Sequence, residues 1–171
     1  MKLTIITIFC LLSLPSFAQK DRFVNLAASG NFNFTTHGFG TNDAGAGLGL
    51  TASFFPQHKL QLLAETGAEM FFGSKELIIN PKGRENKDPV IYSIKAGPQL
   101  FISKNIALSV TYGPYLHSIE TAGFTNDFGF RFGITGFSGK KKRFVTKLFM
   151  TEIPKDCDIQ YFGVGAGYRF Y

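Results

Sequence analysis

The sequence predicts an all-β fold, an eight-stranded antiparallel up-and-down transmembrane β-barrel. Segments of about ten residues alternate apolar side chains with small or polar ones, which is the period of a strand with two different faces. After residue 18 no uncharged apolar run approaches the ~20 residues of a membrane-spanning helix, so insertion into a membrane would have to come from strands. The chain also closes on an aromatic-rich alternating segment, 159–171.

The first residues predict an export signal. Lys2 supplies a positive start, Leu3 to Leu14 form an apolar stretch, and Ser16-Phe17-Ala18 is a small-x-small cleavage site. We therefore expect a signal peptide over 1–18, cleaved after Ala18, and a single barrel domain over 19–171.

Four alternating segments fill the first half of the chain: 24–34, 44–55, 60–72 and 90–102. The segment 24–34 sets one apolar face against a face of Asn and Ser; the apolar residues are Val24, Leu26, Ala28, Phe32 and Phe34. In 60–72 the alternation is broken by Leu63 and Phe71. Pro98 lacks the N–H that a ladder needs, so we expect a local bulge there.

The second half supplies four more segments: 106–117, 128–137, 144–153 and 159–171. Pro114 predicts another bulge. Both faces of 144–153 contain apolar residues, so the pattern leaves the phase of this segment open. In 159–171 the apolar face alternates with glycines and Arg169.

Connections of two lengths separate these segments. Short turns are expected at 56–59, 103–105 and 138–143, on the periplasmic side if the N-terminus lies there. The connections 37–42, 73–89, 120–127 and 154–158 then face outward, as in outer-membrane barrels with short periplasmic turns and longer external loops.

Charged residues within the segments fall on the small, polar face, except Glu152 near the end of the segment 144–153. An Arg or Lys facing the lipid midplane costs roughly 2–4 kcal/mol, which explains this placement. Lys147 is also expected on the small, polar face. We predict an ion-pair network in a filled, narrow interior, made by Glu65, Glu69, Lys95, Arg131 and Arg169.

Aromatic residues near the segment ends predict interfacial girdles. On the short-turn side they are Phe54, Phe55, Phe137, Phe144, Tyr168 and Phe170. On the other side they are Phe34, Phe72, Tyr92 and Phe128. A soluble lipocalin-like ligand binder is the alternative architecture, but its outer face would be charged, whereas here the non-apolar face is mostly Gly, Ser, Asn and Thr.

With this alternation and aromatic terminal segment, the mature chain resembles the small eight-stranded outer-membrane barrels. That group includes the OmpA-like transmembrane domain and the outer membrane protein beta-barrel domain family. The resemblance implies a Gram-negative outer-membrane location and a C-terminal signal read by the barrel-assembly machinery, here Tyr168, Phe170 and Tyr171. Tyr171 lies one residue out of phase with the apolar face that ends on Phe170.

The sequence indicates the function of the protein less specifically than its architecture. The formal charge is +6, which for an exported protein favours lipid or lipopolysaccharide phosphates as partners over nucleic acid. We expect a monomer without cofactor or metal. We favour a non-enzymatic barrel that acts in envelope integrity or through its outer loops.

Two other functions stay open: a conduit for small hydrophobic molecules and a lipid A deacylase-like enzyme. His117, Ser118 and Glu120 could serve such an enzyme. However, neighbouring strand residues point to opposite faces, which separates His117 from Ser118. Paired carboxylates such as Glu65 and Glu69 could also act as acid and base, although an interior ion pair explains them more simply.

Overall fold

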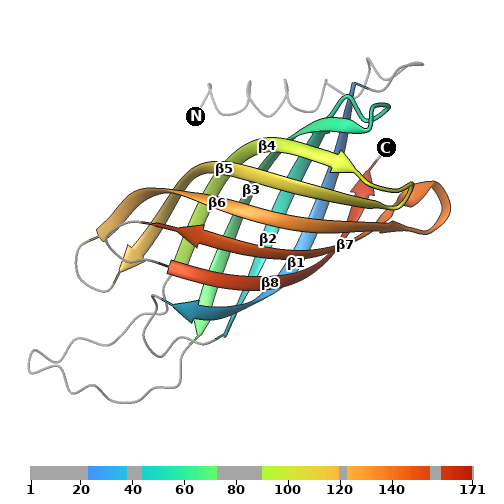
Figure 1. Cartoon of the computed structure of the whole chain (residues 1–171). Helices are drawn as coiled ribbons and strands as arrows, with labels where there is room; N and C mark the ends of the chain where they lie inside the picture. Colours follow the sequence, from blue (N-terminus) through green and yellow to red (C-terminus); the bar gives the residue numbers. More distant parts are fainter. Residues whose placement is uncertain (1–22, 38–43, 73–89, 120–122, 155–158, 171) are drawn as a thin grey trace, which may run out of the picture.

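The structure, a computed structural model, describes residues 23–37, 44–72, 90–119, 123–154 and 159–170. Eight strands pair antiparallel in chain order, and β1 pairs with β8 to close a barrel (Figure 1). They are β1 (Val24–His37), β2 (Ala44–Phe54), β3 (Leu60–Phe72), β4 (Val90–Phe101), β5 (Ile106–Ile119), β6 (Gly123–Ser138), β7 (Phe144–Ile153) and β8 (Ile159–Phe170). The predicted fold class is confirmed. The predicted signal peptide over 1–18 lies outside the described residues.

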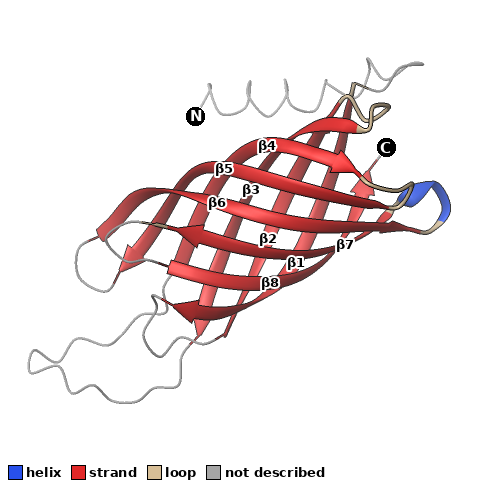
Figure 2. Ribbon diagram, in the orientation of Figure 1, coloured by secondary structure: helices blue, strands red, loops and turns tan. Residues whose placement is uncertain are grey.

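The two ends of the barrel differ. Short turns after β2, β4 and β6 lie at the end where β1 begins and β8 finishes, which we call the short-turn end (Figure 1). One of these turns contains a 3-10 helix, η2 (Lys140–Lys142), shown in blue in Figure 2. At the opposite end the strands are joined through 38–43, 73–89, 120–122 and 155–158, all outside the described residues. We call it the long-connection end after the seventeen-residue connection 73–89. No helix in the described part of the chain is long and apolar enough to cross a bilayer.

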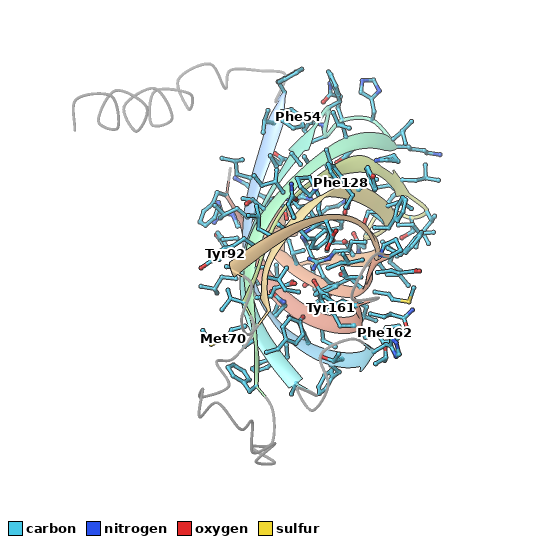
Figure 3. All side chains as sticks on the ribbon, turned by 90° about the vertical axis from the view of Figure 1, so that its left-hand side faces the viewer. Phe54, Met70, Tyr92, Phe128, Tyr161 and Phe162 are labelled. Carbon is cyan, nitrogen blue, oxygen red and sulfur yellow. The ribbon has the colours of Figure 1, made fainter. Side chains whose placement is uncertain are left out.

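The outward face of the barrel is predominantly apolar on every strand, and the charged Glu152 near the end of β7 is an exception. Leu48 is 73% exposed, Phe32 69% and Ile94 66%. Seen end-on, Met70, Tyr92 and Phe162 lie outside the ring of strands and Tyr161 lies within it (Figure 3). An apolar outer belt around a closed sheet suits a lipid environment, since water would penalise so much exposed apolar surface.

The structure settles the phase of β7. Val145 and Phe149 are buried at 4% and 8% exposure, whereas Leu148 is 54% exposed. Lys147 therefore shares the inward face with Val145 and Phe149. Leu63 and Phe71, which break the apolar alternation of β3, also point inward and are buried. The geometric alternation is thus intact, and the interior accepts large apolar side chains.

The two expected proline bulges are absent. Pro98 pairs with Leu62 and Pro114 with Phe128 without a register shift, so neither proline forms a bulge. Between β4 and β5 the register is constant from the pair of Ile91 with His117 to the pair of Phe101 with Ala107. Neither Pro98 nor Pro114 is among the paired residues of these two strands. A register shift occurs instead between Thr35 and His37, where β1 pairs with β8.

The expected connection over 120–127 is mostly strand, since β6 begins at Gly123 and pairs with β5. Polar residues can continue a strand here because backbone pairing, unlike the apolar pattern, does not end where the apolar belt ends. Phe137 does not join an interfacial girdle. It lies inside the barrel at 5% exposure, because its position in β6 alternates with that of the outward Gly136.

Inward-facing glycines leave the space that large side chains occupy. A Cβ at Gly163 would lie 2.1 Å from Cζ of Phe149, and one at Gly47 would lie 2.7 Å from Cγ of Glu69. Eight strands enclose barely enough room for side chains. Each of these two large side chains therefore fits because the residue opposite it on the neighbouring strand is a glycine, which has no side chain.

Candidate functional site

The barrel interior gathers most of the candidate site residues, and it is layered along the barrel axis. Toward the long-connection end lies an apolar cluster of buried side chains. Its members are Phe71, Ile91, Tyr115, Phe149, Ile153, Ile159 and Tyr161. Phe71 and Tyr161 pack edge to face, with ring centroids 5.1 Å apart. Strand alternation brings these residues together, because each occupies an inward position of its strand.

Glu69 and Arg131 form the first ion pair below this cluster. Nη2 of Arg131 lies 2.8 Å from Oε1 of Glu69. The Tyr161 hydroxyl donates to the other Glu69 oxygen and accepts from Arg131 Nη2 at 3.0 Å. The guanidinium carbon also stacks 4.1 Å from the centroid of the Phe149 ring. The carboxylate and the guanidinium are thereby held between polar and aromatic partners.

Glu65 forms the second ion pair, with Lys147. Nζ of Lys147 lies 2.8 Å from Glu65 Oε1 and donates to Thr51 Oγ1 at 2.7 Å. Lys147 was expected on the inward face but not in the network. It joins because the phase of β7 directs it toward β2 and β3 across the interior.

The other two basic residues of the predicted network differ in position: Lys95 lies at the same level as these carboxylate pairs, directly across from Glu65 in the strand register, and Arg169 lies apart from them. Lys95 is 2% exposed, and its Nζ donates to Ser93 Oγ at 2.6 Å and lies 5.2 Å from the centroid of the Tyr115 ring. Arg169 lies near the short-turn end of β8, where its guanidinium carbon stacks 4.3 Å from the centroid of the Phe137 ring. Arg169 lies at a different depth from the two carboxylates, because Glu65 and Glu69 are in the middle of β3, whereas Arg169 is one residue from the end of β8.

Little free space is left between the charges. A cavity of about 20 Å³ touches Glu65, Glu69, Lys95, Arg131 and Lys147, enough for about one water molecule. We call these five residues the charged layer. Nearer the short-turn end, Ala107, Phe137 and Val145 form a second apolar cluster with Phe101 packed against it.

The predicted enzyme residues can be located only in part. His117 and Ser118 are consecutive residues of β5, paired with Thr125 and Phe124 of β6. Their side chains and all of Glu120 lie outside the described part of the structure. Glu65 and Glu69 are engaged in the ion pairs above. Among the described residues, no group of three or more His, Cys, Asp or Glu is arranged to hold a metal ion.

The predicted assembly signal sits at the end of β8. Tyr168 is 37% exposed and Phe170 51%, both on the outward face, and their ring centroids are 5.6 Å apart. Tyr168 also packs against Phe144, and its hydroxyl lies 3.1 Å from Arg143 Nη1. Tyr171 lies outside the described residues.

No protein-family model matches the sequence, and no curated protein matches it. Solved structures do resemble the fold. Ail, the attachment invasion locus protein of Yersinia pestis, is 16% identical, with 86% of this chain and 97% of that chain covered and a TM-score of 0.55. Neisserial surface protein A is 13% identical, with 86% and 96% covered and a TM-score of 0.56. OprG of Pseudomonas aeruginosa is 12% identical, with 90% and 99% covered and a TM-score of 0.51. At such identities the likeness concerns the fold, and this chain has the fold of the small eight-stranded outer-membrane β-barrels.

Proposed function

We propose that this chain is an integral outer-membrane protein with a closed lumen that acts without catalysis, in envelope integrity or through its outer loops. The observation that carries the proposal is the filling of the interior. The apolar cluster and the charged layer succeed one another along the axis, and the cavity among the charges measures about 20 Å³. A hydrated ion needs a continuous water path, which these buried layers interrupt.

Conductance in planar bilayers tests the closed lumen. The folded wild-type barrel should give no large, stable channel openings. The double variant F71A/F149A lacks two rings of the apolar cluster and is the positive control for an opened water path through the lumen. Heat-modifiable migration on denaturing gels verifies that both proteins are folded. Large, stable openings of the wild type would overturn the closed lumen.

A surface role is favoured by the distribution of polar sequence. Between β3 and β4 the chain carries the seventeen residues 73–89, rich in charged and turn-forming residues, and binding residues are disproportionately found in such connections. Two of the similar structures have names that describe a surface role, the attachment invasion locus protein and Neisserial surface protein A. The soluble lipocalin-like alternative is disfavoured, because the apolar face points outward.

Two experiments separate the surface role from the lipid-modifying enzyme. Profiling lipid A by mass spectrometry in cells that express wild type or H117A/S118A should reveal the same acylation pattern. Deleting residues 74–88 should alter adhesion or detergent sensitivity while the barrel still folds. A lipid A pattern that depends on His117 and Ser118 would replace the proposed function with the enzyme.

A further inference from the structure

The short-turn end of the barrel is strongly basic. Its turns and the adjoining strand ends contain seven Lys and Arg residues, whereas the described residues 54–61, 101–106, 138–144 and 168–170 contain no Asp or Glu. The seven are Lys59, Lys104, Lys140, Lys141, Lys142, Arg143 and Arg169. Such a concentration of one sign attracts anions and raises their local concentration.

Part of this basic end is hollow. A pocket of about 510 Å³ opens between the three turns and is lined by His58, Lys59, Lys104, Lys142 and Arg169, among others. Lys142 reaches across the mouth from the β6–β7 turn, where its Nζ donates to the carbonyl oxygen of Lys104 and lies 5.9 Å from the Phe101 ring centroid. We call this hollow the mouth pocket.

Backbone hydrogen bonds fix the rim of the mouth pocket. The N–H of Phe101 donates to the Lys59 carbonyl oxygen, and the N–H of Phe137 donates to that of Asn105, both at 2.8 Å. The Gln61 side chain holds the β2–β3 turn by donating from Nε2 to the carbonyl oxygens of Pro56 and His58 at 3.0 and 3.1 Å. The basic side chains therefore extend from anchored backbone.

The wall of the mouth pocket also offers an acceptor. Gln61 is 5% exposed and lines the pocket, and its Oε1 has no hydrogen-bond partner among the described residues. A buried amide oxygen without a donor is unfavourable, so a ligand hydroxyl there would be stabilising. Cations at the rim and an acceptor in the wall together select a ligand with an anionic group and hydroxyl donors.

We propose that the mouth pocket binds a phosphate ester bearing free hydroxyl groups, of the phosphoglycerol type. Lys and Arg side chains bind phosphate oxygens through short, charge-assisted hydrogen bonds. The glycerol hydroxyl donates to Gln61 Oε1. Either an anionic phospholipid headgroup or a soluble glycerol phosphate carries this chemistry.

Binding is measured with the full-length folded barrel in nanodiscs of phosphatidylcholine. Isothermal titration with glycerol 3-phosphate, inorganic phosphate and a glutamate-rich peptide provides the soluble arm. Nanodiscs containing one fifth phosphatidylglycerol provide the lipid arm, read out by native mass spectrometry of retained lipid. Saturable binding in either arm supports the site, and the arm in which it occurs identifies the source. Glycerol 3-phosphate should bind more tightly than inorganic phosphate, because it alone offers hydroxyl groups on carbon to Gln61.

A matched pair of variants locates the binding. K104Q/K142Q removes two charges from the mouth pocket, and K141Q/R143Q removes two from the same end outside its lining. The first should weaken binding roughly tenfold or more, as expected when charge-assisted bonds are lost, and the second only slightly. Equal weakening by both pairs would mean diffuse attraction and overturn the site. Equal binding of the glutamate-rich peptide, or no saturable binding in either arm, would also overturn it.

Discussion

Arg131 and Glu69 lie 62 positions apart in sequence and meet inside the barrel, with Nη2 and Oε1 separated by 2.8 Å. Their side chains are 14% and 5% exposed. A buried pair of this kind is sensitive to the loss of one partner, because the remaining charge is left in a medium that solvates it poorly. Stability measurements should therefore treat the two residues as one unit.

Replacing Glu69 with Ala should lower the free energy of unfolding by about 3–5 kcal/mol, whereas E69L/R131L should be much milder. Urea unfolding of the barrel in lipid vesicles measures both. The chain contains no tryptophan, so unfolding is followed by circular dichroism and gel mobility. A double variant at least as damaging as the single one would show that uncompensated charge is not the cause.

Substitution of Gly163 by Ala should destabilise the barrel by about 1–3 kcal/mol, the usual effect of overpacking. The added Cβ would lie 2.1 Å from Cζ of Phe149. Gly49→Ala is the matched control, since its Cβ would lie 3.4 Å from the nearest atom, the carbonyl oxygen of Thr66. Shortening the ring in G163A/F149L should recover only part of the stability, because the added Cβ would still lie 2.6 Å from Oδ1 of Asn33. Equal effects of the two single glycine variants would contradict the steric explanation.

Leu48→Arg places a charge in the middle of the outward face of β2 and should lower stability in lipid vesicles by about 2–4 kcal/mol. Leu60→Arg lies at the first position of β3, beside a short turn, and should lower it by no more than about 1 kcal/mol. Both side chains are well exposed, at 73% and 60%. The same unfolding assay compares them. A depth-independent penalty would argue against lipid around this face.

Phe170→Ala should slow assembly into the outer membrane, if the aromatic end of β8 is read by the assembly machinery. The measurement is the fraction of heat-modifiable, folded protein in the membrane shortly after induction. Phe162→Ala is the control because Phe162 lies on the same strand and face, with 47% exposure against 51% for Phe170. Equal delays would show that lost apolar surface, not the position of the residue, is responsible.

The alternation of residue types predicted the strands well where apolar outward residues alternate along the strand with small inward residues. It failed at the start of β6, because residues 123–127 are polar enough to resemble a loop although they pair with β5. It also underestimated the apolar character of the interior. Phe71 interrupts the pattern of β3, and only the closed sheet reveals that it meets Tyr161, 90 positions later, across the interior.

The interior charges were predictable one by one, but their partners were not. Glu69 and Arg131 could be assigned to the inward face from strand period alone. Lys147 could not be assigned to Glu65 while the phase of β7 was open. Arg169 shares the inward face but lies at a different depth, and depth depends on the register and tilt of all eight strands, which no single segment encodes.

The fit between Gly163 and Phe149, and between Gly47 and Glu69, also constrains how such a barrel can change over generations. A bulkier residue at either glycine is accessible only after its large neighbour has become smaller, so replacements must occur in cross-strand pairs and in a fixed order. The outward face carries no such coupling, because lipid yields to any apolar shape. Drift should therefore be fast and independent outside and slow and paired within, so that little identity survives between barrels of the same architecture.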